Sequence, residues 1–275
     1  MKLIRSAAAG LDADAVVLVE WDAGKRLADK VPAIYESGEV TGEFLQFTLL
    51  HGVSGFTPRR VLLAGAGKRE KFDAAALRKL AGAAVRFLKG KGVRSLVFAL
   101  DDGLNGAEHV EAVARGVILA AWEPDRLKSK KEQKPSEVET VTLAAENSDP
   151  TLDAALERGQ ALAQAENVAR DIAVEPPNLL NPTVMAAHAR VVAEANGLEF
   201  DLLDQNRMRQ MGMGALLGVA QGSAEPPALM VMRYKPENGS GSPHLGLVGK
   251  GVTFDTGGIS IKPAEGMEKM KYDMA

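Results

Sequence analysis

Strand-length apolar runs alternate with helix-length amphipathic segments along the first half of this sequence. This alternation restricts the possible fold classes more than any other feature of the chain. Residues 15–19, 61–64 and 95–99 are continuous apolar runs, as expected for strands that are buried on both faces. Residues 72–89 and 105–122 carry apolar side chains at helical spacing. Strands that alternate with helices of this length favour a parallel, helix-covered sheet. The sequence therefore predicts an α/β fold.

A boundary near residue 150 divides the chain into two predicted domains, residues 1–150 and 151–275. The charged stretch 128–135, which ends in a proline, is interpreted as a solvated linker. A further strand is expected at residues 138–144. After it, a long helix from about residue 151 to 173 would bridge the two halves.

The second half begins with residues 175–182, where three prolines oppose helix formation. Asn181 and Pro182 are residue types typical of a helix N-cap and first turn, and Asn196-Gly197 is typical of a helix C-terminus. Further strands are expected at residues 198–203, 228–234 and 245–248.

Composition and charge exclude several classes of function. The chain contains no cysteine, which excludes disulfide scaffolds, thiolate metal sites and cysteine nucleophiles within it. Its net charge of −3 gives no support for a nucleic-acid or anionic-membrane partner. Asp12 and Asp14 interrupt the apolar stretch near the N-terminus, and no apolar run approaches the roughly 20 residues of a membrane span. These features predict a cytoplasmic protein.

The last thirty residues include Lys250, Lys262 and two aspartates, together with many glycines. Lys250 and Asp255 are separated by roughly 17 Å in an extended chain, so they can share an ion only if the backbone doubles back between them. Glycine permits the required conformations. Glycines at positions 246, 249, 251, 257 and 258 lie close to these two residues.

The residues that follow add a second lysine and a second aspartate. Residues 259–262 alternate apolar and polar side chains, which predicts Ile259 and Ile261 in the core and Lys262 on the opposite face. Methionines recur at helical spacing around Asp273 and would present it toward the same pocket. Together these residues predict a divalent-metal site beside a bound carbonyl group.

The two lysines are expected to differ in protonation. Lys250 can ligate a metal only as the neutral amine, and both a neighbouring dication and a desolvated site lower the pKa of a lysine. Lys262, held off the metal and near carboxylates, would stay an ammonium and polarise the carbonyl. Such a pair would provide an acid and an electrophile within one pocket.

Two strings of residues resemble the leucyl (cytosol) aminopeptidase family, peptidase family M17. They are Val248-Gly-Lys-Gly-Val-Thr-Phe-Asp-Thr-Gly-Gly-Ile-Ser-Ile-Lys-Pro263 and Met270-Lys-Tyr-Asp-Met274. Three further segments are similar to that family's interdomain region: residues 126–131, 167–171 and 175–178. The resemblance spans the whole chain, weakly before residue 120 and strongly after residue 245.

The resemblance implies an N-terminal macro-domain-like α/β module followed by the first part of a mixed-sheet α/β catalytic domain. Lys250, Asp255 and Asp273 match ligands of the tightly held metal, Asp255 also bridges to a second ion, and Lys262 matches the catalytic lysine. The family removes N-terminal amino acids, often leucine, from peptides by means of two Zn²⁺ or Mn²⁺ ions and a hydroxide that attacks the carbonyl. It assembles as homo-hexamers.

The family's second motif, Asn-Thr-Asp-Ala-Glu-Gly-Arg, does not occur in these 275 residues. It brings another metal-binding aspartate, a bridging glutamate and the arginine that holds a bicarbonate base. Smaller departures are Thr256, where the family usually has serine, and Ala275, where glycine is common. We therefore expect the chain to be the N-terminal part of such an enzyme. It should bind at most one divalent ion, pack incompletely over residues 151–275, and lack activity by itself.

Two other functions remain open on the sequence. The first is a noncatalytic macro-like module for binding or assembly, which would bind a ligand such as ADP-ribose independently of Asp255. The second is phosphate binding. Gly65-Ala-Gly67 lacks the third glycine of a dinucleotide motif because Glu70 occupies its place, and residues 248–251 lack the Gly-Lys-Ser/Thr order. Both phosphate signals are weak.

Overall fold

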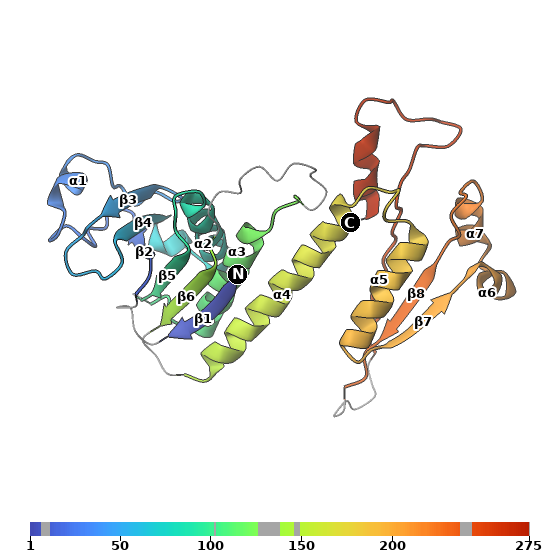
Figure 1. Ribbon diagram of the computed structural model, residues 1–275, viewed down its shortest axis with the longest axis horizontal. Helices are drawn as coiled ribbons and strands as arrows, with labels where there is room; N and C mark the ends of the chain where they lie inside the picture. The colour runs from blue at the N-terminus through green and yellow to red at the C-terminus, as the bar shows by residue number, and fades with distance from the viewer. Residues whose placement is uncertain (7–11, 102, 126–137, 146–148, 237–243, 275) are drawn as a thin grey trace. The chain divides into compact units, whose positions relative to one another are not determined.

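The computed structural model describes residues 1–6, 12–101, 103–125, 138–145, 149–236 and 244–274, without the side chains of residues 272–274 (Figure 1). Contacts divide the chain into two compact units, Met1–Val168 and Ala169–Ala275. The expected linker at residues 128–135 lies outside the described residues.

Strands and helices alternate through the first unit. Its elements are β1 (Lys2–Ser6), β2 (Ala15–Trp21), α1 (Pro32–Glu36), β3 (Phe47–His51), β4 (Arg60–Gly67), η1 (Arg69–Lys71), α2 (Ala74–Leu88), β5 (Ser95–Leu100), α3 (Ala107–Ala121) and β6 (Thr140–Ala145). A long helix, α4 (Thr151–Val174), leads into the second unit. There the elements are α5 (Pro182–Ala195), β7 (Glu199–Leu203), α6 (Gln205–Gln210), α7 (Gly214–Ala220), β8 (Leu229–Arg233) and η2 (Met267–Met274).

The first unit is built on a six-stranded sheet in the order β1-β6-β5-β2-β4-β3. All neighbouring strands run parallel except β3, which is antiparallel to β4. The predicted parallel sheet is confirmed. Three of its interior strands, β2, β4 and β5, fall on the three apolar runs, and the interior strand β6 falls on the strand expected at residues 138–144. The two edge strands were not predicted. Because an edge strand is only half buried, neither β1 nor β3 carries a continuous apolar run.

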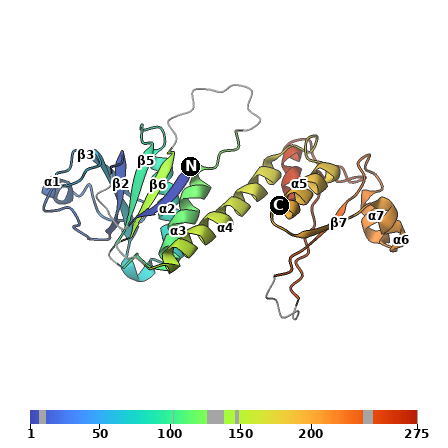
Figure 2. The same cartoon turned by 60° about the horizontal axis from the view of Figure 1, so that its bottom comes forward.

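Alternate side chains of each interior strand face opposite layers. Val17, Leu62 and Phe98 belong to the core cluster that includes the buried faces of α2 and α3. Val16 and Leu63 point the other way, into a smaller cluster that the segment between β2 and β4 covers. The period of two along each strand therefore produces a layer on each side of the sheet (Figure 2).

The first half of α4 belongs to the first unit. Gly159 packs so closely on α3 that a Cβ atom there would lie 2.8 Å from the carbonyl oxygen of Glu111. Near the start of the helix, Arg5 Nε donates to Asp153 Oδ1 at 2.6 Å. The two units consequently divide at Val168 and Ala169, later in the chain than the predicted boundary near residue 150.

In the second unit, α5 packs on the antiparallel pair β7 and β8. The predicted start of this helix is confirmed, since Val184 N–H donates to Asn181 Oδ1 at 2.9 Å and Pro182 occupies the first turn. Its end at Asn196 and Gly197 also matches, and Gly197 has φ +66°. The strand expected at residues 245–248 is wrong. Those residues are exposed and form no ladder, because no strand of the described chain pairs with them.

Among the residues that the structure describes, none of the helices combines the length and apolarity needed to span a bilayer.

The side chain of Asp14, the residue before β2, forms hydrogen bonds at the start of β5. Its Oδ2 accepts hydrogen bonds from the backbone N–H groups of Arg94 at 2.8 Å and Ser95 at 2.9 Å. These two bonds hold the pKa of Asp14 below its ordinary value. The carboxylate therefore contributes stability above the unfolded pKa of about 3.9, and this stability is lost as the pH falls through the lower folded pKa.

Asp14→Ala is expected to lower the free energy of unfolding by about 1–2 kcal/mol at pH 7, because two backbone donors lose a charged acceptor that is partly exposed to solvent. Urea unfolding of both proteins at pH 7 and below pH 3 would show the difference shrinking in acid. Asp29→Ala, at an exposed position, is the matched control. An equal loss at both pH values would contradict the assigned role of the carboxylate.

Candidate metal centre

A glycine-containing turn brings Lys262 back to Asp255. Lys262 N–H donates to the carbonyl oxygen of Thr256 at 2.8 Å, which closes the turn. Gly257 and Gly258 have φ angles of +90° and +65°, in the left-handed region that glycine adopts without strain. A Cβ atom on Gly257 would lie 2.3 Å from the carbonyl oxygen of Ser260, so the turn leaves no room for a side chain there.

Asp255 is held by two donors within this turn. Its Oδ2 accepts from Lys262 Nζ at 2.9 Å, and its Oδ1 accepts from the backbone N–H of Gly257 at 2.8 Å. The hydrogen bond from Lys262, then that from Gly257, hold the pKa of Asp255 below its ordinary value, and the charge of Lys250 acts in the same direction. The carboxylate is thus ionised and fixed in orientation.

The other two predicted ligands are placed less completely. Lys250 is exposed. Asp273 lies in η2, and its side chain is outside the described residues. The segment η2 nevertheless reaches the Asp255–Lys262 pair, because Met270 Sδ lies 3.2 Å from Lys262 Nζ. The structure therefore brings together Asp255, Lys262 and the backbone of the segment that carries Asp273.

Lys271 is a partly buried cation outside the predicted set of site residues. Burial lowers the pKa of its ammonium group, and the negative charge of Glu175 opposes that change. Glu175 belongs to the proline-rich segment that follows α4. Residue type alone did not distinguish this lysine from its neighbour Lys269, because the distinction arises from burial.

The predicted burial of Ile259 and Ile261 is wrong in this structure. Both side chains are exposed, Ile259 completely and Ile261 by 73%. The alternating pattern specifies two faces, but burial also needs a surface that packs on one of them. No such surface covers these side chains within the described part of the chain.

The Asp255 carboxylate and the Gly257 N–H that orients it fit the role of one ligand of a metal centre. Carboxylate oxygens suit Mn²⁺, Mg²⁺ and Zn²⁺, and a backbone N–H that fixes the second oxygen is typical of ligating carboxylates. The described side chains include no group of three histidine, cysteine, aspartate or glutamate residues able to hold an ion. The predicted ligand set contains a lysine, Lys250, and it contains Asp273, whose side chain is outside the described residues.

Family comparisons assign both parts of the chain to one class of protein. Residues 167–275 match the catalytic domain of the cytosol aminopeptidase family, and residues 13–131 match the N-terminal domain of the same family. Together with the α/β fold, these matches place the sequence in the aminopeptidase class. The chain belongs to the cytosol aminopeptidase family, peptidase family M17.

Curated relatives extend the match along the chain. A probable cytosol aminopeptidase of Solibacter usitatus is 50% identical over 265 residues, which cover 96% of this chain and 54% of the relative. The cytosol aminopeptidase of Pseudomonas aeruginosa is 38% identical over 257 residues, covering 89% of this chain and 50% of the relative. The chain thus spans about half the length of these relatives.

Solved structures agree with this fold. The bottromycin maturation enzyme BotP in complex with Mn is 31% identical, with a TM-score of 0.78 over 95% of this chain and 53% of that one. A mutant of tomato leucine aminopeptidase is 22% identical, with a TM-score of 0.80 over 93% of this chain and 55% of that one. The second likeness supports the fold alone.

Proposed function

We propose that this chain carries one part of the active site of a metal-dependent aminopeptidase. In this proposal Lys250, Asp255 and Asp273 hold a divalent ion, and Lys262 acts on the peptide carbonyl. The observation that carries it is the pairing of Asp255 with Lys262 across the Gly257 turn. This pair lies within the region that matches the family's catalytic domain.

The divalent ion would supply Lewis-acid polarisation of the scissile carbonyl and activation of water at neutral pH. Mn²⁺ is supported by the BotP complex with Mn and by the oxygen-rich ligand set; Zn²⁺ is the alternative. Asp255 is already fixed by Gly257 N–H, so it loses little conformational freedom on ligation. The ammonium of Lys262 would donate to the carbonyl oxygen as negative charge develops there.

Peptides with a free N-terminus are the proposed substrates, with removal of leucine-type residues. Removal of N-terminal residues follows from the names of the relatives, which are cytosol aminopeptidases, as does a cytosolic location. The leucine-type preference follows from the family resemblance. A homo-hexamer is the proposed assembly, from the family resemblance. Light scattering coupled to size-exclusion chromatography would measure it.

We also propose that activity needs more than these 275 residues. The Asn-Thr-Asp-Ala-Glu-Gly-Arg motif is absent from them, and the relatives are about twice as long. One ion at most is therefore expected to bind to the 275-residue chain. Robust hydrolysis of a leucyl amide by this chain, with Mn²⁺ or Zn²⁺ supplied, would contradict the proposal.

Asp255→Asn is expected to weaken Mn²⁺ binding at least tenfold, because an amide replaces a charged ligand. The measurement is a Mn²⁺ titration followed by electron paramagnetic resonance. It is made on a polypeptide that continues from this chain through the missing motif. Glu225→Gln, an exposed carboxylate elsewhere in the second unit, is the control. Unchanged Mn²⁺ affinity in Asp255→Asn would remove Asp255 from the metal centre.

A further inference from the structure

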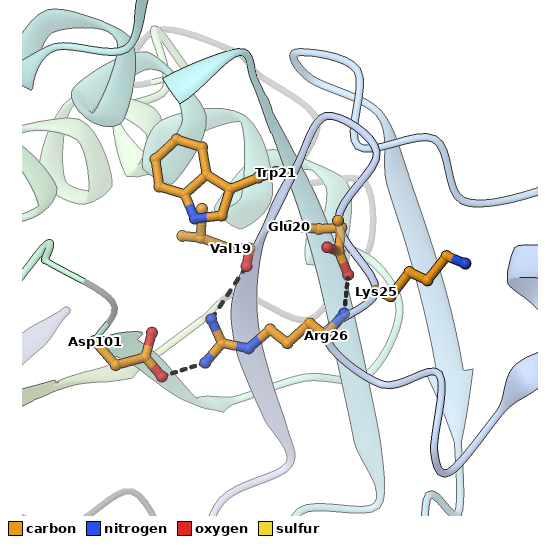
Figure 3. A pocket seen from close by; sticks show the side chains of 7 residues that line it. Val19, Glu20, Trp21, Lys25, Arg26 and Asp101 are labelled. Atoms are coloured by element: carbon orange, nitrogen blue, oxygen red, sulfur yellow. Dashed lines mark hydrogen bonds and ion pairs between the residues drawn. The ribbon is translucent and has the colours of Figure 1, made fainter. Parts of the chain in front are cut away.

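A second candidate site lies in the first unit, away from the Asp255 turn. A cavity of about 450 Å³ opens at the carboxyl ends of β2 and β5 (Figure 3), and its volume falls in the range of small-molecule sites. We call it the β2–β5 cavity. It is lined by Val19, Glu20, Trp21, Gly24, Lys25, Arg26 and Asp101.

The topology of the sheet favours ligand binding at this position. β2 and β5 are parallel neighbours. After β2 the chain turns toward β3 and β4, whereas after β5 it passes through α3 to β6, on the other side. The connections that leave β2 and β5 therefore run in opposite directions along the sheet, and a crevice forms between them. In open α/β sheets, ligands bind in the crevice at such a switch point, outside the carboxyl ends of the strands.

The loop after β2 is held in an uncommon conformation. Ala23 has φ +55°, in the left-handed region that residues with a Cβ atom rarely adopt. A Cβ atom on Gly24 would lie 2.1 Å from Glu20 Oε1, so the loop closes directly over the carboxylate. Backbone strain of this kind is concentrated at ligand sites.

Glu20 anchors this loop from inside the sheet. It is 2% exposed, and its Oε2 accepts from the Tyr35 hydroxyl at 2.7 Å and from Arg26 N–H at 3.3 Å. Burial, followed by the hydrogen bond to Glu20, raises the pKa of Tyr35 to about 12. Tyr35 therefore remains a donor at neutral pH, and Oε2 of Glu20 is already satisfied.

Asp101 has one oxygen that is not satisfied. Arg26 bridges Asp101 Oδ2 and the carbonyl oxygen of Val19, as Figure 3 shows. The other oxygen, Oδ1, is covered from solvent and has no hydrogen-bond partner among the described residues. An unmet buried acceptor is unfavourable, and the terminal torsion of aspartate is soft. A small rotation would offer this oxygen to a donor within the cavity that Asp101 lines.

The charges around the cavity select the class of ligand. The lining contains two cations, Lys25 and Arg26, and two carboxylates, Glu20 and Asp101, so it is neutral overall. A phosphate ester would bring two negative charges close to both carboxylates. A zwitterion instead offers an ammonium group to Asp101 and a carboxylate to Lys25, which is exposed and makes no ion pair within the described residues. Trp21 would contact its apolar part.

We infer that the β2–β5 cavity binds a small zwitterion, a free α-amino acid or a short peptide, through Asp101 and Lys25. Both kinds of ligand carry an α-ammonium group and a carboxylate. In Figure 3 Asp101 and Lys25 lie beyond opposite ends of the Arg26 side chain, so a short peptide reaches both more readily than a single amino acid. The inference stands on residues of the first unit and does not rest on the proposed function.

The test uses Trp21 as a reporter. The chain has two tryptophans, so Trp122→Phe leaves only the one that lines the cavity. This variant is combined with Asp255→Asn and studied in EDTA, which removes the proposed metal centre as a competing site. Fluorescence is titrated with leucine, Leu-Gly-Gly, N-acetyl-leucine, leucinamide and AMP. Saturable binding of Leu-Gly-Gly or leucine is expected, with affinity at least tenfold lower for N-acetyl-leucine and AMP.

Variants then test the two contacts. Asp101→Asn should weaken zwitterion binding at least tenfold, and Lys25→Met several-fold for the zwitterions but not for leucinamide. Asp29→Asn, outside the cavity, should bind as the parent does. Circular dichroism verifies folding, and the acetylated ligand tests the ammonium contact without altering the protein. The inference fails if no zwitterion binds, if AMP binds more tightly, or if folded Asp101→Asn and Lys25→Met bind normally.

Discussion

Phe98→Ala is expected to lower the free energy of unfolding of the first unit by about 3–5 kcal/mol. Phe98 is completely buried in β5 and belongs to the cluster that includes the buried faces of α2 and α3. β5 is hydrogen-bonded to β2 on one side and β6 on the other, so the backbone cannot move inward to fill the space. The loss would take a large share of the 5–15 kcal/mol that stabilises a typical domain.

Phe44→Ala provides the control for this core substitution. Phe44 is 39% exposed, and its ring meets that of Phe72 edge-on with centroids 6.4 Å apart. Its removal should cost only about 1 kcal/mol. Urea denaturation followed by far-ultraviolet circular dichroism compares the two variants. Equal losses would mean that Phe98 does not occupy the core that the structure assigns to it.

Burial on both faces is what made much of this fold predictable. Three interior strands, β2, β4 and β5, each contain a continuous apolar run of strand length, and that run made each of them visible in the sequence. The edge strands β1 and β3 alternate only partly, and α1, α6 and α7 are too short to show a helical period. The helices α2 and α3 were predicted because several turns of a buried face leave a regular pattern, whereas α5 was predicted from the residue types at its two ends.

The candidate sites differ in how far apart their residues lie in the sequence. Asp255 and Lys262 are near neighbours. The sequence predicted a backbone reversal between Lys250 and Asp255, and Gly257 and Gly258 were among the glycines expected to permit it. Arg26 and Asp101 meet only because β2 and β5 are adjacent in the sheet, and local pattern carries no information on that contact. One signal was present, since Glu20 is a charged residue that directly extends the apolar run of β2.

Lys262→Met is expected to lower kcat about 100-fold to 1000-fold in a polypeptide that includes the missing second motif. The proposed role of the ammonium is to stabilise negative charge on the carbonyl oxygen in the transition state, a contact that the ground state lacks. Such a loss reduces kcat and leaves KM nearly unchanged. Initial rates with a leucyl amide and a short leucyl peptide would measure it, with Lys269→Met, an exposed lysine of η2, as the control.

Metal content must be measured in the same samples, because Lys262 also pairs with Asp255 at 2.9 Å. If the lysine only orients this carboxylate, Lys262→Met would lose metal, and excess Mn²⁺ would restore the rate. If the lysine acts on the carbonyl, the variant keeps its metal and stays slow at any Mn²⁺ concentration. The second result is expected, because Gly257 N–H still fixes the other oxygen of Asp255. A rate within threefold of the parent, with full metal, would contradict the catalytic role.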